Sequence, residues 1–193
     1  YTTLHYTSLY HHHHHHHHMA KTDSFFIRKS ININNDLDFY QDTIDLGAYV
    51  DALGKAVLRI HNISVQYSDV DGRTPSITGS SNGTSCSADF QLTTQTQTDM
   101  VVTGDNKSVV ASGRMTSYAF GTSGTVFPSI TSNDLDLGPQ HWTQGYLIGV
   151  EQLYLGGAAT TGWQEDVVVS IVMECVSETL TKEAAMALAL SQQ

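Results

Sequence analysis

The feature that most limits what this chain can fold into is a run of alternating residues at positions 163–178. One parity of this run is apolar, so an extended chain points all of those side chains to one face. The other parity mixes valines with serine, glutamine and acidic residues. The run therefore predicts a long strand with one dry and one mixed face. Its apolar members are Val167, Val169, Ile171, Met173 and Cys175.

The preceding stretch, residues 144–155, is apolar on both parities. Tyr146, Ile148 and Val150 occupy one parity, and Leu147, Leu153 and Leu155 the other. A strand covered on both faces belongs in the middle of a sheet, so we expect these residues to form a second long strand. Residues 156–162 are small and Gly-rich, which predicts a loop that turns the chain back between the two strands.

Further strand patterns precede this pair. The stretch 56–68 changes the parity of its apolar residues at His61-Asn62, which predicts a β-bulge or a change of covered face there. The Thr- and Gln-rich stretch 90–100 predicts a strand with a solvated face, and 76–87 predicts an exposed loop. The other expected strands are residues 25–33, 108–120 and 126–131.

These patterns add up to about eight strands separated by turn signals, which is typical of sandwiches and barrels. The chain shows no alternation of strands and helices. Asp45 is positioned to cap a short internal helix over residues 49–53, which Gly54 would end. We therefore expect an all-β, antiparallel two-sheet sandwich containing one short internal helix.

The two ends differ from the body of the chain. Residues 11–18 are eight consecutive histidines followed by Met19, so we interpret residues 1–18 as an expression tag or fused peptide. Residues 19–180 form the predicted β-domain. Residues 181–193 predict a terminal helix with Thr181 as its cap, and its side chains are apolar nearly all round. Such a helix must be buried by its own body or by another subunit, so Met186, Leu188 and Leu190 are the predicted assembly residues.

Charge and cysteine usage exclude several classes of function. The sequence carries 9 basic and 19 acidic residues, a net charge of −10. The basic residues are dispersed rather than gathered on one arm, so strong autonomous binding to nucleic acid is not expected. Cys86 and Cys175 show no disulfide or metal spacing, and no signal peptide or membrane-spanning run is apparent. No cofactor motif occurs.

The candidate site residues have simpler interpretations. Asp69 and Asp71 resemble the start of a calcium loop, but the Gly and Glu positions that should follow are not met, so an Asp-rich turn is favoured. His141 beside Trp142 fits a packed aromatic pair, and His61 fits a bulge residue. Cys175 has no visible catalytic partner. The sequence therefore predicts no catalytic residues and no enzyme.

The body of the chain does resemble a known class of proteins. Over residues 25–178, the strand number, the short internal helix and the Ser-, Thr-, Gly- and Asn-rich loops resemble single jelly-roll capsid proteins of small viruses. The stretch 54–63 (GKAVLRIHNI) is also similar to viral coat sequence. The resemblance implies a structural protein of the virion that is made in the host cytoplasm and self-assembles into a closed shell.

One departure from the resemblance is the missing basic N-terminal arm, since only Lys21, Arg28 and Lys29 lie in that region. Any genome contact would then be weak or indirect, and a membrane contact is left open. The alternative is a β-sandwich binding module, such as a trimeric fibre domain that binds a receptor or a carbohydrate. A buried terminal helix would favour the shell, whereas exposed aromatic residues at loop tips would favour the module.

Overall fold

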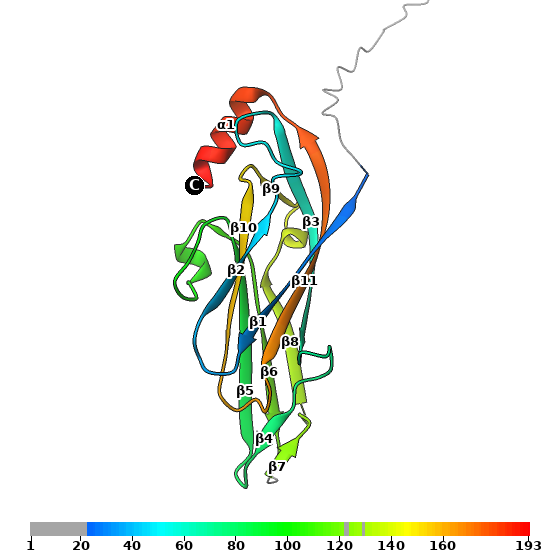
Figure 1. Ribbon diagram of the computed structural model, residues 1–193, viewed down its shortest axis with the longest axis vertical. Helices are drawn as coiled ribbons and strands as arrows, with labels where there is room; N and C mark the ends of the chain where they lie inside the picture. The colour runs from blue at the N-terminus through cyan, green and yellow to red at the C-terminus, as the bar shows by residue number, and fades with distance from the viewer. Residues whose placement is uncertain (1–22, 122–123, 129) are drawn as a thin grey trace, which may run out of the picture.

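The computed structural model describes residues 23–121, 124–128 and 130–193, so the predicted tag lies outside the described residues. Two antiparallel sheets face each other in an elongated sandwich, with one helix at its upper end in Figure 1. The strands are β1 (Phe25–Asn34), β2 (Tyr40–Asp45), β3 (Ala56–Ser68), β4 (Ile77–Gly79), β5 (Thr84–Thr93), β6 (Val109–Ala119), β7 (Gly124–Val126), β8 (Ile130–Leu137), β9 (Tyr146–Ile148), β10 (Gln152–Ala159) and β11 (Val167–Thr179). The helical elements are the 3-10 turns η1 (Thr103–Asp105) and η2 (Pro139–His141) and the helix α1 (Lys182–Ser191).

The strand order is that of a jelly roll. One sheet, called sheet A, has the order β1-β11-β3-β9, and the other, sheet B, has the order β2-β10-β5-β6-β8. Consecutive strands thus alternate between the sheets at both ends of the chain, which is the arrangement of two interlocked Greek keys. A small third sheet pairs β4 with β7 at the lower end of the molecule (Figure 1). The prediction of an antiparallel two-sheet jelly roll is confirmed.

The alternating run at the end of the sequence forms β11, in the middle of sheet A. The residues of its apolar parity, from Val167 through Ile171 to Cys175, are each at most 1% exposed. Burying side chains of this size contributes about 1.5–3 kcal/mol each, so this face dominates the core. The other parity is half-buried on the outer face of sheet A, as the alternation predicted.

The predicted bulge is also confirmed. Glu174 of β11 lies opposite Asn62, and the next residue, Cys175, lies opposite Ile60, so His61 is the extra residue. Before the bulge, Leu58 and Ile60 point into the core. After it, the inward parity switches to odd-numbered residues.

The stretch 144–155 does not form one strand, and that prediction was wrong. Ile148 lies in β9 of sheet A, whereas Leu153 and Leu155 lie in β10 of sheet B. Both parities are apolar because the chain crosses from one sheet to the other, so each half presents a different parity to the same core. The expected loop 156–162 is also shorter than predicted, since β10 continues to Ala159 between β2 and β5.

Other local predictions need correction. Residues 46–54 form turns rather than a helix, and Asp45 accepts a hydrogen bond from Gly47 N at 2.8 Å. The expected loop 76–87 contains β4 and the start of β5, anchored by the buried Ile77. The stretch 90–100 leaves the sheet after Thr93, and Gln91 and Thr93 are buried rather than solvated. Residues 126–131 are split between β7 and β8, and β8 continues past the expected strand end to Leu137.

Candidate assembly surfaces

The helix α1 presents two faces of different character. Ala185 and Ala189 are buried against the body, and Leu188 is partly buried with them. Met186 is 44% exposed and Leu190 68% exposed, one turn apart on the outer face. The structure therefore brings two of the three predicted assembly residues together on the surface and turns Leu188 inward.

Specific contacts fix α1 onto the end of the sandwich. The side chain of Thr181 accepts a hydrogen bond from Ala184 N at 3.2 Å, as the predicted cap. At the other end, Gln192 accepts from Gly149 N at 2.7 Å and donates to Leu147 O at 2.8 Å. A Cβ on Gly149 would lie only 2.8 Å from Cγ of Leu188, so the glycine permits the close approach of the helix. The outer face of α1 is thus held in a defined position.

A buried ion pair lies beside the start of α1. Nε of Arg59 donates to Oε1 of Glu178 at 2.5 Å and Nη2 to Oε2 at 3.0 Å. The side chain of Glu178 is fully buried and that of Arg59 is 14% exposed. Nη1 of Arg59 also donates to Gln144 O at 2.8 Å. Two-point geometry of this kind ties β3, β11 and the chain before β9 together.

Aromatic side chains gather at the opposite end of the sandwich. Phe120, Phe127 and Ile130 are all exposed, and Phe120 packs edge-on against Tyr118 at a ring-centroid distance of 5.3 Å. Tyr118 of β6 lies directly opposite Ile130 of β8. This cluster was not predicted from the sequence, although the alternation of Tyr118 and Phe120 just before a Gly turn was a usable signal.

A hollow of about 380 Å³ adjoins this aromatic cluster on the outer face of sheet B. Tyr118 and Ile130 form part of its wall. The remaining lining is rich in hydroxyl groups, contributed by Ser85, Ser87, Thr116, Ser132 and Thr160. An aromatic wall beside hydroxyl groups offers both stacking and hydrogen bonding to a polar ligand.

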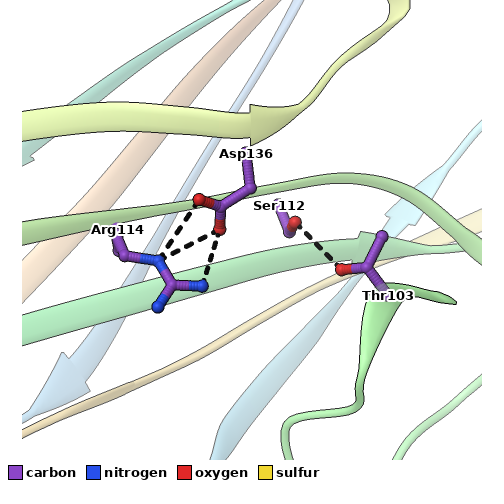
Figure 2. A network of polar contacts seen from close by, with 4 residues as sticks. All are labelled: Thr103, Ser112, Arg114 and Asp136. Carbon is purple, nitrogen blue, oxygen red and sulfur yellow. Dashed lines mark hydrogen bonds and ion pairs between the residues drawn. The ribbon is translucent and has the colours of Figure 1, made fainter. Parts of the chain in front are cut away.

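Charged residues form the next row along the outer face of sheet B. Asp89, Arg114 and Asp134 are cross-strand neighbours on β5, β6 and β8. Figure 2 shows Arg114 paired with Asp136, through Nε at 3.2 Å to both carboxylate oxygens and Nη2 at 3.0 Å to Oδ2. Burial raises the pKa of Asp89 above its usual range, and the nearby Arg114 opposes this rise only in part.

Close to this pair, hydroxyl groups connect η1 to the sheet. The Ser112 and Thr103 hydroxyls lie 3.3 Å apart, which links the η1 segment to β6 (Figure 2). Gln91 supports the same segment from β5, because its Oε1 accepts from Val101 N at 3.0 Å. Residues 94–108 are therefore held to the sandwich by buried polar groups rather than by apolar packing.

Tyr67 carries a buried polar atom, its hydroxyl oxygen, that lacks a hydrogen-bond partner in the described part of the chain. Its hydroxyl is buried between the sheets and has no hydrogen-bond partner among the described residues. Its ring is tilted against Phe90 at a centroid distance of 6.3 Å. Burial raises the pKa of Tyr67 well above its usual value, so the hydroxyl stays neutral.

The candidate calcium residues lie in a hydrogen-bonded turn. Oδ1 of Asp69 accepts from Asp71 N and Arg73 N, both at 2.9 Å, which is the Asp-turn geometry that the sequence favoured. Within residues 23–121, 124–128 and 130–193, no group of three or more His, Cys, Asp or Glu side chains is placed to hold a metal ion. His61 lies in the bulge of β3 and His141 at the end of η2, which packs against β3 through hydrogen bonds of Gln140 to Ile63, and Trp142 is half-exposed. No helix in the described part is long and apolar enough to cross a membrane.

Comparisons with known proteins give a resemblance in architecture. No protein-family model matches the chain, and no curated protein matches it. The solved structures that match include VP1 of Trichodysplasia spinulosa-associated polyomavirus in complex with sialylated glycooligomers, at 9% identity and a TM-score of 0.47, covering 82% of this chain and 96% of that one. The unassembled VP1 pentamer of Merkel cell polyomavirus matches at 9% identity and a TM-score of 0.40, covering 82% and 96% of the two chains.

Proposed function

We propose that this chain is a structural subunit of a virion, which associates with copies of itself into a closed protein shell. The observation that carries the proposal is the combination of a jelly-roll strand order with apolar side chains exposed at both ends of the sandwich. Met186 and Leu190 lie at the end that carries α1, and Phe120 and Phe127 lie towards the other end. Exposed apolar side chains at two separate sites suit a subunit with neighbours on more than one side.

The charge of the chain indicates how such subunits would associate. Copies with a net charge of −10 repel one another, so apolar and hydrogen-bonded contacts must supply the attraction. Salt screens that repulsion over a Debye length of about 10 Å at ~0.1 M, and assembly should therefore increase with salt. A shell nucleated by nucleic acid would show the opposite dependence, because salt weakens phosphate contacts steeply.

The test is light scattering and negative-stain microscopy of nuclease-treated protein over a salt series. Closed particles that become more abundant with salt and lack absorbance near 260 nm support the proposal. Protein that stays monomeric at every salt and protein concentration would refute it. Particles that dissolve with salt and contain nucleic acid would overturn the proposed mode of assembly.

The role of α1 can be tested separately with variants of its outer face. The double variant Met186→Ser/Leu190→Ser should keep the fold but shift the protein from particles to small oligomers. Ala187→Ser changes the same face without removing apolar volume and serves as the matched control. Unchanged particle size in the double variant would mean that α1 only covers the end of its own sandwich.

A second candidate function is supported by the aromatic cluster and its adjoining hollow. Tyr118, beside the hydroxyl-bearing side chains that line the hollow, favours a module that binds neutral or acidic sugars. Calorimetric titration with oligosaccharides, including sialylated ones, tests this function. Tyr118→Ala, which removes the aromatic wall of the hollow, should then weaken binding at least as strongly as it affects assembly, whereas Phe127→Ala serves as an exposed aromatic control outside the hollow.

A further inference from the structure

The outer face of sheet A contains a second hollow, of about 500 Å³, that none of the surfaces above uses. The register of the three strands places its residues in two adjacent rows. Arg28, Val172 and Ser64 form one row across β1, β11 and β3, and Ser30, Ser170 and Gln66 form the next. The depression exists because short serine and valine side chains occupy the middle while Arg28 and Gln66 stand at its rim.

In the rows on either side of this hollow, polar side chains are hydrogen-bonded to one another. On one side, Asn62 donates to Glu174 at 2.7 Å, and on the other, Asn32 donates to Asp166 at 3.0 Å. In contrast, the side chains of these two rows make no hydrogen bond to other described residues, whereas Lys29, which also lines the hollow, pairs with Asp42 of β2 at 2.8 Å. The ion pairs of the described chain use Lys29, Arg59 and Arg114, and none of them uses Arg28. The hollow thus offers a free guanidinium and free hydroxyl groups over an apolar floor.

The turn between β1 and β2 has the complementary shape and charge. Leu37 is 64% exposed and has a backbone φ of 68°, a conformation that is uncommon for leucine. Carboxylates flank it in the sequence at Asp36 and Asp38. Strained, exposed positions of this kind are often functional, and here the strain holds an apolar side chain away from the protein.

Hydrogen bonds make this turn rigid. Leu37 N donates to Ala159 O at 2.9 Å, and Asp36 accepts from Asp38 N at 3.1 Å and from the Tyr40 hydroxyl at 2.5 Å. Asp36 is therefore committed to the turn, whereas the exposed Asp38 carboxylate makes no side-chain hydrogen bond to other described residues. A preorganised projection loses little conformational entropy when it binds.

We propose that the hollow on sheet A receives the Asp36-Leu37-Asp38 turn of a second copy of this chain, with Leu37 over Val172 and Asp38 paired with Arg28. This inference rests on the proposed function, because it names one of the contacts that would join the subunits. The contact is heterologous, since the hollow and the turn are different surfaces of the molecule. Contacts of that kind repeat from copy to copy, and they form the rings that a shell requires when the rotation between neighbouring copies closes.

A charge exchange tests the pairing. Arg28→Asp and Asp38→Arg should each raise the protein concentration needed for assembly by about tenfold, because each places like charges together. The double variant should restore assembly towards the wild-type concentration. Arg73→Asp and Asp71→Arg, on an exposed turn elsewhere, provide controls with the same charge changes. Circular dichroism confirms that every variant is folded.

Disulfide trapping tests the contact directly. Leu37→Cys protein mixed with Val172→Cys protein should form a cross-linked dimer under mild oxidation with copper phenanthroline, because the proposed contact brings these two positions together. The native Cys86 and Cys175 are buried and should not take part. Leu37→Cys mixed with Leu53→Cys should not. Wild-type assembly without the cross-link, or charge reversal without effect, would overturn this inference and leave the proposed function standing. Wild-type protein that never assembles would overturn both.

Discussion

The buried ion pair between Arg59 and Glu178 gives the sharpest test of how this sandwich is stabilised. Arg59→Ala removes a guanidinium, and two hydrogen bonds of 2.5 and 3.0 Å, from a carboxylate with no solvent exposure. Breaking a buried pair by removing one partner typically costs about 3–5 kcal/mol, because the remaining charge loses its counter-charge. That is a large part of a total stability of about 5–15 kcal/mol.

Replacing both partners should have a much smaller effect. Arg59→Met/Glu178→Leu substitutes apolar side chains of similar length, and such exchanges of buried pairs are often neutral or stabilising. The pair Arg114–Asp136 provides a matched control, because it has the same two-point geometry but side-chain exposures of 58% and 33%. Arg114→Ala should therefore cost no more than about 1 kcal/mol.

The measurement is urea unfolding of the four proteins at a concentration where the chain is monomeric. The midpoints should fall in the order wild type, Arg114→Ala and Arg59→Ala, with the double variant near the wild type. An Arg59→Ala variant no less stable than Arg114→Ala would refute the claim that burial makes this pair important. A double variant as unstable as Arg59→Ala would show that shape, rather than charge, is what the site requires.

Three further predictions concern single buried groups. Tyr67→Phe should stabilise the protein in urea unfolding by about 1 kcal/mol, since it removes a buried hydroxyl without a partner among the described residues; a loss of stability would reveal a hydrogen bond. Asp89→Asn should stabilise the protein at pH 7, because the raised pKa of Asp89 means that the ionised carboxylate is disfavoured in the fold. This gain should shrink as the pH falls and vanish below about pH 3, under the ordinary Asp pKa of about 3.9, where the carboxyl is protonated in both states, and a gain independent of pH would contradict this reasoning. Burial raises the pKa of Cys175 to about 12 and also raises that of Cys86, so a thiol reagent at pH 8 should label neither until urea unfolds the protein; rapid labelling of the native protein would contradict it.

Features set by local pattern could be predicted from the sequence. The burial of β11 follows from strict alternation, and the cap of α1 follows from Thr181 before an apolar run. For these two features the signal lies within a few residues of the feature that it determines. The number of strands and turns predicted a sandwich or barrel, and the jelly roll was expected from the resemblance to viral capsid proteins.

Features set by contacts between distant parts of the chain could not be predicted from the sequence. Gly149 marks the point where the chain leaves sheet A, but a glycine in an apolar run is also typical of a bulge or a kink. Gln91 is polar and lies next to a Thr-rich segment, so its burial depends on the backbone of Val101, ten residues away. The turn conformation of residues 46–54 is likewise fixed by partners outside it, such as Glu151, whose backbone oxygen accepts from Leu46 N at 2.7 Å.

The hollow on sheet A depends on both kinds of information. Leu58 and Ile60 place even-numbered residues of β3 in the core, and without a bulge Ser64 would also point inward. The extra residue His61 reverses the parity, so Ile63 and Tyr67 enter the core while Ser64 and Gln66 reach the outer face. The parity change was visible in the sequence, but the partners of Ser64 across the sheet were not. A single inserted residue thus exchanges an apolar row for a polar one, and it does so on the surface where we propose that two copies meet.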